Sequence, residues 1–468
     1  MKVGIIGAGA AGLTAGYELG KHGHDVTVYE RAPFLGGQAS TFDLGGFLLE
    51  RGYHHLFTSD LDIIDLAEEI GLGDQIRWFN STVGTFYGGR IYNFVTPLDL
   101  LKFTPLSFID RLKLGLMTIR LQNKKEWKSF EDITADQWLR DHVSEDAYNV
   151  FWEPMLRGKF GEDNFRKVGM AWIWGKIQTR FASRGKGFAR EVLGYPIGSF
   201  GEIFDVLGSK IEGFGGRVCT STTVTRVEIQ SNQATGLFLK HTPATWISPA
   251  PADFSQDSDI GTNNDPNEKM ESSYQSFDAI ISTTPSYEFA ELVPEFPKGY
   301  LSKLNEVDYL AAVLLILVLK HPLSNVYWLN VADRSIPFVG VIEQTNLVNP
   351  EKYGGDHVVY ISNYVSENDR LYGLGHQDLL EEYLPYLRKL NPEFDISWVS
   401  TSYHHKVKAA QPIIGVNHSS HIPDHTTPFE GLYLANTTQI YPEDRGTNYS
   451  VRIGKIAANL VMEKFSTV

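Results

Sequence analysis

Two adjacent histidines, His54 and His55, are the residues of this sequence best suited to proton transfer. They lie in the stretch ERGYHHLFTSD, and histidine is the side chain whose ordinary pKa lies closest to neutral pH. A histidine that faces a pocket could shuttle a proton or orient a bound group. The alternative interpretation is a pair of ordinary polar residues in a loop, and the residues themselves leave both open.

Basic residues gather among aromatic ones in the stretch from Trp152 to Arg184. Arg157 and Lys159, separated by one glycine, are the strongest candidates for binding an anionic substrate such as a carboxylate or a diphosphate, and Arg180 is a further one. The alternative is that these side chains extend from a packed helical domain into solvent.

A charged turn precedes the last apolar stretch of the chain, in IYPEDRGTNYSVRIG. One interpretation places Arg445 or Tyr441 at the face of a bound substrate. The other is a structural turn held by salt bridges among Glu443, Asp444 and Arg445.

Metal and nucleophile chemistry find little support in the sequence. His418, His421 and His425 resemble a ligand cluster, but Pro423 interrupts their spacing and no acidic motif accompanies them, so a solvated loop is favoured. The one cysteine, Cys219, excludes a disulfide framework and a cysteine metal site. We expect no metal.

A glycine-rich turn near the N-terminus has the spacing of a dinucleotide-binding motif, GxGxxG. Its first glycine permits a tight turn, its second lets the backbone approach a pyrophosphate, and its third lets the following helix pack on the preceding strand. Glu30 stands eighteen residues after the last glycine, where a carboxylate can accept both ribose hydroxyls. The residues of this predicted phosphate cradle are Gly7, Gly9, Ala10, Ala11 and Gly12. NAD and FAD both fit the motif.

The elements that position these residues follow from local patterns. A strand over residues 2–7, a helix over 10–22 and a strand over 25–30 predict a βαβ unit. The elements predicted further along are a hairpin around Gly88-Gly89, a mostly helical segment at 97–181, a buried strand at 309–319, helices at 197–213, 378–390 and 448–463, and a strand at 432–435. Residues 243–272 lack apolar side chains to bury and predict a surface loop.

Bulk composition limits the partners and the location of the protein. The chain has 468 residues, a net charge of −14 and a pI near 5.5, which argues against nucleic acid as a partner. The longest apolar run, at 309–319, is too short to span a membrane, and the start of the chain does not resemble a signal peptide. We expect a cytoplasmic protein with a small-molecule substrate. The amphipathic span 97–121 leaves peripheral membrane contact possible, and a packed domain helix is the favoured alternative.

From Gly7 to Gly37 the sequence resembles the FAD-dependent amine oxidase superfamily, which includes protoporphyrinogen oxidase-like proteins, phytoene desaturases and, more remotely, UDP-galactopyranose mutase. The resemblance is carried by the glycine-rich turn, the acid-arginine pair with Gly-Gly in ERAPFLGGQ, the block YPIGSFGEIF, FDAIISTTP and EGLYLANTTQ. It implies FAD as the cofactor. Arg31 would lie near the adenosine, Gly37 and Gln38 would run past the pyrophosphate, and Val224 would line the adenine.

The resemblance also implies contacts around the flavin ring. Thr283 would bring backbone close to the cofactor, and one of the two histidines would touch the ring or the substrate. Many relatives have Gly-Asp where this chain has Asn436, which puts the usual contact with the ribityl chain in doubt. The start of the last helix would point at the ring, with Thr447, Asn448 and Tyr449 beside it.

Together these observations predict an α/β protein, a Rossmann-like FAD-binding domain with a nested α+β substrate domain. The predicted FAD-binding domain is discontinuous, 1–95, 190–290 and 405–468, and the predicted substrate domain comprises 96–189 and 291–404. The expected function is an FAD-dependent oxidoreductase that takes a hydride from a C–H or C–N bond of an organic substrate. The alternative is a redox-neutral flavoenzyme such as a sugar-nucleotide mutase or isomerase. The substrate, the electron acceptor and the oligomeric state stay open.

Overall fold

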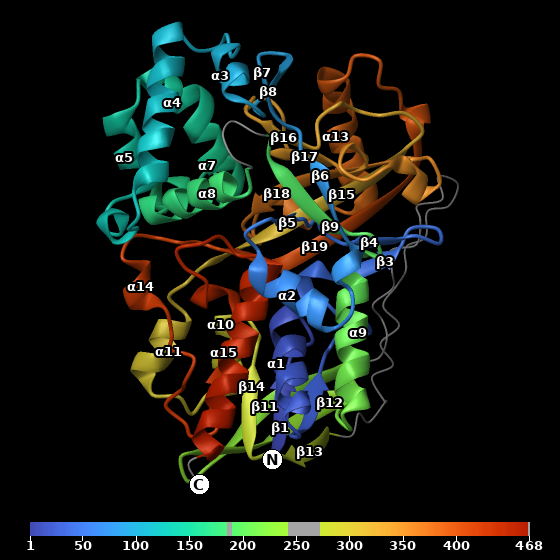
Figure 1. Cartoon of the computed structure of the whole chain (residues 1–468), viewed down its shortest axis with the longest axis vertical. Helices are drawn as coiled ribbons and strands as arrows, with labels where there is room; N and C mark the ends of the chain where they lie inside the picture. The colour runs from blue at the N-terminus through green and yellow to red at the C-terminus, as the bar shows by residue number, and fades with distance from the viewer. Residues whose placement is uncertain (185–189, 242–271, 467–468) are drawn as a thin grey trace.

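A five-stranded parallel sheet forms the centre of the lower half of the molecule in Figure 1. The computed structural model describes residues 1–184, 190–241 and 272–466, so most of the predicted loop at 243–272 lies outside the described residues. The strand order β10-β2-β1-β14-β20 brings together segments from across the chain, namely Arg217–Cys219, Asp25–Tyr29, Lys2–Ile6, Ala279–Ser282 and Leu432–Leu434. The predicted βαβ unit is confirmed, with α1 (Ala10–Lys21) joining β1 to β2.

Three helices cover one face of this sheet, and glycines set how closely they approach. Helices α9 (Ser199–Gly213) and α15 (Thr447–Ser466) flank α1. A Cβ atom on Gly454 of α15 would lie 2.4 Å from the carbonyl oxygen of Ala11, and one on Gly16 would lie 2.9 Å from Ile211. Only glycine allows contact this close between helix backbones.

The other face of the parallel sheet carries a small antiparallel sheet. It consists of β11 (Thr222–Gln230), β12 (Gln233–His241) and β13 (Ser272–Ser276). Val227 and Leu237 of this sheet share a buried core with Ile6 and Ile280. The lower half of the molecule is therefore a three-layer arrangement of the kind predicted for a Rossmann-like domain.

A second sheet, with seven strands, lies above the first and carries the longest apolar run of the chain. Its order is β19 (Val399–Pro412), β15 (Tyr309–Leu319), β18 (His357–Val365), β17 (Gly340–Glu343), β16 (Trp328–Val331), β7 (Val83–Tyr87) and β8 (Arg90–Asn93). The predicted buried strand at 309–319 is confirmed as β15, because β18 and β19 satisfy its backbone on both sides.

The predicted hairpin around Gly88-Gly89 is confirmed as β7 and β8, with both glycines at positive φ. The predicted boundary at residue 95 assigns this hairpin to the FAD-binding domain, but β7 pairs with β16 of the seven-stranded sheet. The boundary at residue 405 likewise cuts through β19. We therefore propose that the substrate domain takes in the hairpin and the whole of β19.

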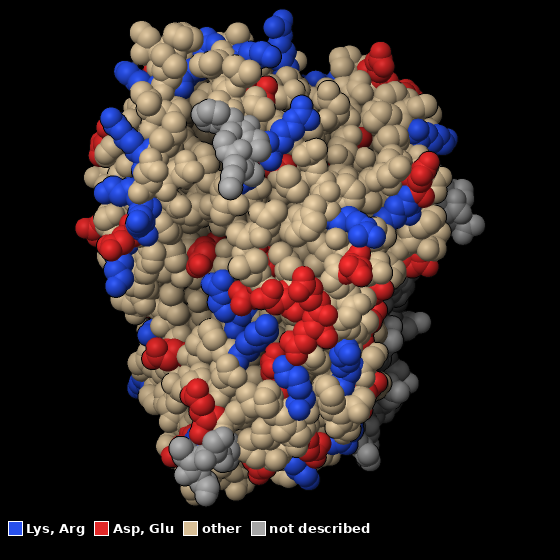
Figure 2. All heavy atoms as spheres, viewed as in Figure 1, with Lys and Arg blue, Asp and Glu red and all other residues tan. Residues whose placement is uncertain are grey.

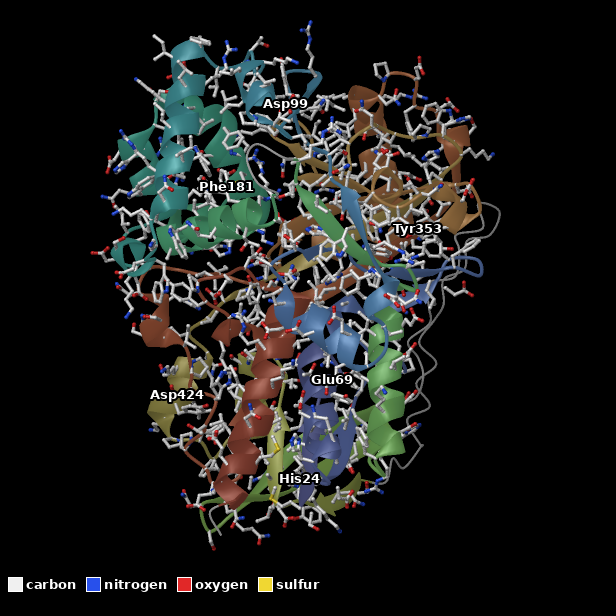
Figure 3. All side chains as sticks on the ribbon, viewed as in Figure 1. His24, Glu69, Asp99, Phe181, Tyr353 and Asp424 are labelled. Atoms are coloured by element: carbon white, nitrogen blue, oxygen red, sulfur yellow. The ribbon has the colours of Figure 1, made fainter. Side chains whose placement is uncertain are left out.

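A helical unit occupies the upper left of Figure 1, as predicted for residues 97–181. Its helices are α3 (Pro97–Leu101), α4 (Phe108–Asn123), α5 (Ala135–His142), α6 (Glu145–Ala147), α7 (Glu153–Phe160) and α8 (Met170–Ala182). In Figure 3, Asp99 of α3 lies above Phe181 of α8, and both lie in the upper half of the molecule. On the opposite side, α13 (His376–Leu390) packs on the seven-stranded sheet, also as predicted. No helix among the described residues is long and apolar enough to cross a membrane.

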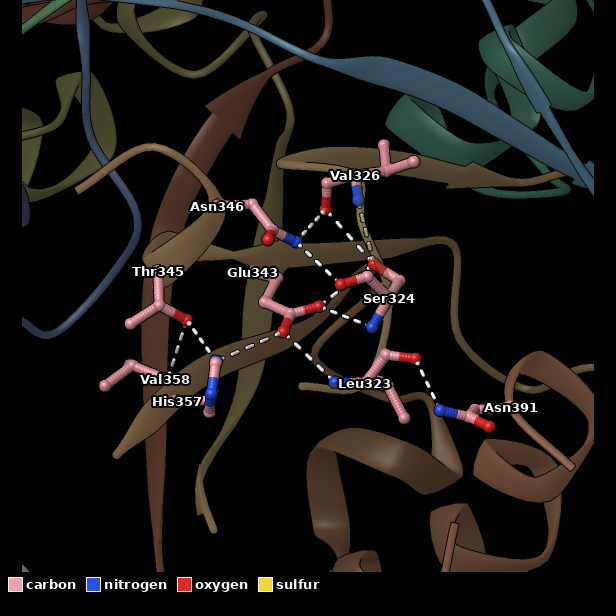
Figure 4. A network of polar contacts seen from close by, with 9 residues as sticks. All are labelled: Leu323, Ser324, Val326, Glu343, Thr345, Asn346, His357, Val358 and Asn391. Atoms are coloured by element: carbon pink, nitrogen blue, oxygen red, sulfur yellow. Dashed lines mark hydrogen bonds and ion pairs between the residues drawn. The ribbon is translucent and has the colours of Figure 1, made fainter. Parts of the chain in front are cut away.

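A buried carboxylate ties a loop to the seven-stranded sheet (Figure 4). Glu343, at the end of β17, accepts hydrogen bonds from the backbone N–H groups of Leu323 (3.1 Å) and Ser324 (2.7 Å) and from the Ser324 hydroxyl (2.9 Å). Asn346 and Asn391 donate to carbonyl oxygens of the same loop. The network satisfies backbone groups that would otherwise be buried without partners.

Candidate functional site

A cleft with about 1160 Å³ of empty space, part of it open to solvent, lies between the two sheets. Its floor comes from the segment after β4 (Leu48–Glu50) and from the start of α15. One wall is the seven-stranded sheet, with Ala312 and Leu314 of β15 and Trp328 of β16, and the other is formed by α7 and α8.

The glycine-rich turn has the geometry of a phosphate cradle. Gly7 adopts a φ of +103°, and a Cβ atom there would lie 2.4 Å from the Thr283 hydroxyl. A Cβ atom on Gly12 would lie 1.9 Å from the carbonyl oxygen of Gly7. Helix α1 begins at Ala10 with no side-chain cap. The N–H groups of Ala10 and the residues after it are therefore placed to bind a phosphate.

Two further segments complete the cradle. Glu30, directly after β2, accepts hydrogen bonds from the backbone N–H groups of Ala8 and Ala32, both at 2.9 Å. A Cβ atom on Gly37 would lie 3.1 Å from the Cα of Gly9, so only glycine lets the two loops meet. This cradle, which a larger side chain would fill, fits the pyrophosphate and ribose of FAD.

Arg31 and Val224 are placed differently from the rest of the cradle. The Arg31 side chain is more than half exposed and forms an ion pair with Glu288 at 3.3 Å. Val224 lies on β11 in the core between the small sheet and the parallel sheet. Their contacts with the adenosine stay predictions.

Arg445 joins the cradle to the seven-stranded sheet and lines the cleft. Its guanidinium donates to the side-chain oxygens of Gln38 (3.2 Å) and Gln411 (3.0 Å) and to the hydroxyl of Tyr364 (3.1 Å). Gln38 in turn donates to the carbonyl oxygen of Ala409 at 2.8 Å. All of these partners are neutral, so the positive charge of Arg445 is oriented by hydrogen bonds without being cancelled by them.

Both predicted histidines line the cleft, and both are held neutral. Nδ1 of His54 donates to the carbonyl oxygen of Gly52 at 2.7 Å, so its Nε2 carries the free lone pair. Nδ1 of His55 lies 3.0 Å from the hydroxyl of Tyr327. Burial lowers the pKa of His54 to about 4 and that of His55 to about 3. At neutral pH the pair can accept protons but cannot donate them as imidazolium.

Asp444 is a buried anion between two lysines. Its carboxylate lies 2.7 Å from Nζ of Lys176 and 3.3 Å from Nζ of Lys159, and it accepts a hydrogen bond from the indole of Trp172 at 3.2 Å. Burial would raise its pKa, but Lys159, Lys176 and Arg445 outweigh that effect and hold the pKa of Asp444 well below its usual range. The salt bridges do not run among the three charges of the turn, because Asp444 pairs with lysines of α7 and α8 and Glu443 pairs with Arg452 at 3.6 Å. Arg445 lines the cleft, and its contact with a substrate stays a prediction.

Tyr364 stands between these charges. Its hydroxyl lies 3.0 Å from that of Tyr53, and the Lys159 ammonium lies 4.8 Å from its ring centroid. Burial raises the pKa of a phenol, but Lys159, Arg445 and the Tyr53 hydrogen bond lower that of Tyr364 to about 8.

The start of α15 lines the cleft with Thr447, Asn448 and Tyr449, and their contact with the flavin ring stays a prediction. The Asn448 side-chain oxygen accepts from the backbone N–H of Ile63 at 3.2 Å. Its side-chain nitrogen is buried and has no hydrogen-bond partner in the described part of the chain, so an acceptor on a bound group would satisfy it.

Other predicted site residues are not among those that line the cleft. The ring of Tyr441 packs against Trp127 (4.9 Å between centroids) and His418 (5.2 Å). Arg157 pairs with Glu153 at 3.4 Å on its own helix. Of the two predicted anion-binding residues on α7, the structure places only Lys159 at the cleft.

The side chains of Thr283 and Asn436 form hydrogen bonds with other groups of the protein. The Thr283 hydroxyl donates to the carbonyl oxygen of Ile6 at 2.8 Å. The Asn436 amide donates to the carbonyl oxygen of Thr284 at 2.9 Å and accepts from the backbone N–H of Thr438 at 3.1 Å. Asn436 thus caps the turn after β20, and its contact with a ribityl hydroxyl stays a prediction.

Sequence reasoning missed Lys176 and Tyr364 and did not pair Asp444 with lysines from the helical unit. A signal for Lys176 was present, since Lys176, Thr179 and Arg180 have helical spacing and all three line the cleft from one face of α8. No local pattern marks Tyr364, which lies near the end of β18. Among the described residues, no group of His, Cys, Asp and Glu is arranged to hold a metal.

Comparison with known proteins agrees with this geometry. The family described as flavin containing amine oxidoreductase matches residues 10–462. Mitochondrial protoporphyrinogen oxidase from Nicotiana tabacum is 27% identical over 168 residues, 35% of this chain and 33% of that protein. The 15-cis-phytoene desaturase of Synechococcus elongatus is 28% identical over 156 residues, 30% of this chain and 33% of that protein. The chain thus spans about a third of the length of these curated relatives.

Solved structures show the fold over the whole chain. An oxidoreductase from Methanosarcina mazei superposes with a TM-score of 0.71 at 19% identity, covering 99% of this chain and 100% of that one. Reduced UDP-galactopyranose mutase gives a TM-score of 0.71 at 15% identity, covering 99% and 95%. Because the family match covers nearly the whole sequence and the glycine cradle fits a dinucleotide, the chain belongs to the flavin containing amine oxidoreductase family, with FAD as its cofactor.

Proposed function

We propose that the protein is an oxidoreductase that removes a hydride from a C–H or C–N bond of a small organic substrate. The observation that carries this proposal is the cleft itself, which adjoins the dinucleotide cradle and has an apolar sheet wall next to neutral histidines. FAD, when bound, supplies the two-electron acceptor for the hydride, and a separate acceptor takes the electrons afterwards. The chain itself has to position the substrate bond and exclude water.

Each wall of the cleft has a part in this positioning. Ala312, Leu314 and Trp328 offer an apolar surface that keeps water from the reacting bond. His54 presents an unprotonated Nε2, which can accept the proton that a substrate releases together with its hydride. Arg445 fixes the start of α15 against Gln38 and Gln411.

Anaerobic mixing tests the proposal. Oxidised holoenzyme is mixed without oxygen with one compound of each class, beginning with primary and secondary amines and then conjugated cyclic substrates. We expect one class to bleach the absorbance band of oxidised flavin and to yield a product two electrons more oxidised. Turnover that requires reduced FAD and leaves the substrate with no net redox change would overturn this proposal in favour of the redox-neutral alternative. That alternative draws support from the cations of the cleft, which would also suit a diphosphate.

Replacing Arg445 tests whether the charged turn serves the flavin or the fold. Arg445→Ala should alter the visible spectrum of the bound flavin, or slow turnover at least about tenfold, since the guanidinium orients groups around the ring. The loss of three hydrogen bonds should also lower thermal stability, so the spectrum and turnover are measured on variant protein that purifies folded with flavin bound. Arg334→Ala, which removes an exposed arginine from outside the cleft, is the control and should leave the spectrum and turnover unchanged. If only thermal stability changes, the turn is structural.

We further propose that the helical unit rests on an anionic lipid surface. Seven large apolar side chains of α3 and α4 are between 36% and 64% exposed, namely Leu98, Leu101, Phe108, Ile109, Leu112, Leu116 and Ile119. Residues 97–125 carry six basic and two acidic side chains in a chain whose net charge is −14. In Figure 2 the top of the molecule above α4 shows uncharged atoms with lysine and arginine at their margin. An apolar helix face with a basic border is typical of interfacial helices.

This face connects to the cleft through α8. Gln178 of α8 donates to the carbonyl oxygen of Leu121 at the end of α4, at 2.9 Å, and Lys176 and Arg180 of α8 line the cleft. A lipid surface at α4 would therefore lie one helix away from the substrate. The predicted cytoplasmic location stays a prediction.

Vesicle sedimentation tests the lipid proposal. The protein should sediment with vesicles of phosphatidylcholine and phosphatidylglycerol at low salt, and Ile109→Ser with Leu116→Ser should weaken this binding at least about tenfold. Phe214→Ser, which replaces an exposed apolar residue (45%) on the distant FAD-binding half, serves as the control. No sedimentation at low salt, or a dimer in solution that the same double variant dissolves, would overturn the proposal.

A further inference from the structure

The cleft carries more positive than negative charge. Among the described residues that line it, the cations are Lys159, Lys176, Arg180 and Arg445, and the carboxylates are Asp60 and Asp444. Arg180 is compensated by Glu191, which is buried behind it at 3.3 Å. Asp60 forms no ion pair with the other three cations in the described part of the chain and accepts a hydrogen bond from the backbone N–H of Phe57 instead.

Of the other three cations, two share one carboxylate, and the third forms no ion pair among the described residues. Lys159 and Lys176 both pair with Asp444, while Arg445 binds only neutral oxygen atoms of Gln38, Gln411 and Tyr364 in the described residues. Asp60 lines the same cleft and interacts electrostatically with Lys176, so the cleft keeps an excess of one positive charge. Withdrawing charge from water is costly, and a buried excess of this kind is stabilised when a further anion joins it.

The three cations face one stretch of the cleft. Tyr364 marks the place, because Arg445 donates to its hydroxyl at 3.1 Å and the Lys159 ammonium lies 4.8 Å from its ring centroid. Lys176 lies near the same place, because it pairs with Asp444, which also pairs with Lys159. The apolar wall formed by Leu314 and Trp328 adjoins this stretch, so charge and apolar surface are offered together.

We propose that the substrate of this cleft carries an acidic group, a carboxylate or a phosphate, which binds between Lys159, Lys176 and Arg445 while its apolar part lies against the seven-stranded sheet. The proposal rests on the proposed function, because it names the substrate class of the same site. Asp444 then serves as a fixed counter-ion that holds the two lysine side chains in place before the substrate binds. Lysine and arginine together suit either acidic group.

The test measures binding, not turnover, and uses the oxidised holoenzyme. Benzoate, phenyl phosphate and the neutral benzyl alcohol are titrated separately while the visible spectrum of the bound flavin is followed. We expect benzoate or phenyl phosphate to perturb the spectrum with saturation at concentrations at least about tenfold below those at which benzyl alcohol acts. Perturbation by benzoate alone identifies a carboxylate subsite, and perturbation by phenyl phosphate alone identifies a phosphate subsite.

Charge-removing variants locate the subsite. Lys159→Gln and Lys176→Gln should each weaken the anionic probe at least about tenfold and leave binding of benzyl alcohol unchanged. Lys408→Gln is the matched control, because Lys408 also pairs with a carboxylate (Glu367, 3.4 Å) and lies over a tyrosine ring (Tyr287, 5.4 Å), but outside the cleft. All variants should purify with flavin bound, which separates a lost subsite from a lost fold.

Two results would overturn the proposal. The first is that the anionic probes bind no more tightly than benzyl alcohol, or bind equally to the lysine variants and to Lys408→Gln. The second is that the lysine variants lower the reduction potential of the flavin while probe binding is unchanged, which would assign the cations to the charge of the reduced flavin. In both cases the proposed oxidoreductase function is tested separately, by the anaerobic oxidation experiment.

Discussion

Two buried carboxylates in this molecule, Asp444 and Glu343, have pKa values that are shifted in opposite directions. Asp444 lies at the cleft within ion-pair distance of two ammonium groups, and its pKa is held well below the usual range. Glu343 lies inside the seven-stranded sheet among backbone N–H groups and a hydroxyl (Figure 4), and burial raises its pKa to about 7. The nearest basic group to Glu343, Nδ1 of His357 at 3.9 Å, is neutral because burial lowers its pKa.

The difference shows that hydrogen bonds alone do not keep a buried carboxylate ionised in this fold. Glu343 accepts three well-placed hydrogen bonds and still holds a proton near neutral pH, whereas Asp444 needs full positive charges to stay an anion. The fold brings two ammonium groups to Asp444 at the cleft, whereas the ion-pair partner of Glu343 among the described residues is a neutral imidazole. Charge in the cleft is therefore a feature that distinguishes the site from the scaffold.

Removing both lysines should make Asp444 behave like Glu343. Lys159→Met together with Lys176→Met should destabilise the protein by about 3 kcal/mol at pH 7, because it leaves an uncompensated buried carboxylate. The cost should shrink at pH 5, where Asp444 can take up a proton. Urea unfolding at both pH values measures this, with Lys408→Met as control. Equal destabilisation at pH 5 and pH 7 would show that the loss is one of packing, not of charge.

Glu343 should make the free energy of unfolding depend on pH in the direction opposite to that of Asp444. Since its pKa in the folded protein is about 7 and that of an unfolded glutamate is about 4.5, the folded state binds more protons between these values. Its contribution to stability therefore falls as pH rises through that window, by about 2–3 kcal/mol, and is constant above it. The free energy of unfolding of Glu343→Gln minus that of the wild type should rise by this amount between pH 5 and pH 8. A difference independent of pH would contradict the raised pKa.

Asp444→Asn should show the mirror-image profile at acid pH. Its depressed pKa stabilises the fold above the pKa of an unfolded aspartate, about 4, and this contribution is lost as pH falls below that value. We expect a loss of about 2 kcal/mol at pH 7 that narrows below pH 4, after discounting for the partial exposure of the lysines. Chemical unfolding across this range gives the profile, and Asp163→Asn, at an exposed position outside the cleft, should leave stability unchanged. A loss of equal size at pH 3 and pH 7 would mean that the ion pairs contribute little.

Replacing His357 should have the smallest effect on the free energy of unfolding. Because it is neutral near pH 7, His357→Gln should change the free energy of unfolding by less than about 0.5 kcal/mol and leave the pH dependence assigned to Glu343 in place. Thermal unfolding at pH 7 and pH 8 provides the check. A loss above about 1 kcal/mol that disappears at pH 8 would show that the histidine is protonated and pairs with Glu343.

Much of the fold could be predicted because its signals are local. The βαβ unit, the hairpin around Gly88-Gly89 and the apolar strand β15 each follow from periodicity and turn residues within a short window. The pairing of the hairpin with β16 could not be predicted in this way. It joins residues more than 240 positions apart, and only the assembled sheet brings their edges together.

The site residues likewise divide into those that local sequence signals predicted and those that only the folded structure places. His54, His55 and Arg445 were found because they sit in segments next to the cofactor motifs. Arg157 and Lys159 were proposed together, yet residues two apart on a helix point to nearly opposite sides, and only Lys159 faces the cleft. Tyr441, four residues before Arg445, packs into the helical unit instead.

The sequence by itself determined the dinucleotide cradle of this protein, because Gly7, Gly9 and Gly12 act through the backbone of one continuous turn. It also determined that charged residues would stand before the last helix. Only the tertiary structure decided which of those charges are cancelled. Asp444 meets Lys176 across 268 residues of chain and Lys159 across 285, and the hydrogen-bond partners of Arg445 among the described residues are neutral. Electrostatic compensation depends on distance in space, which no spacing along the sequence specifies.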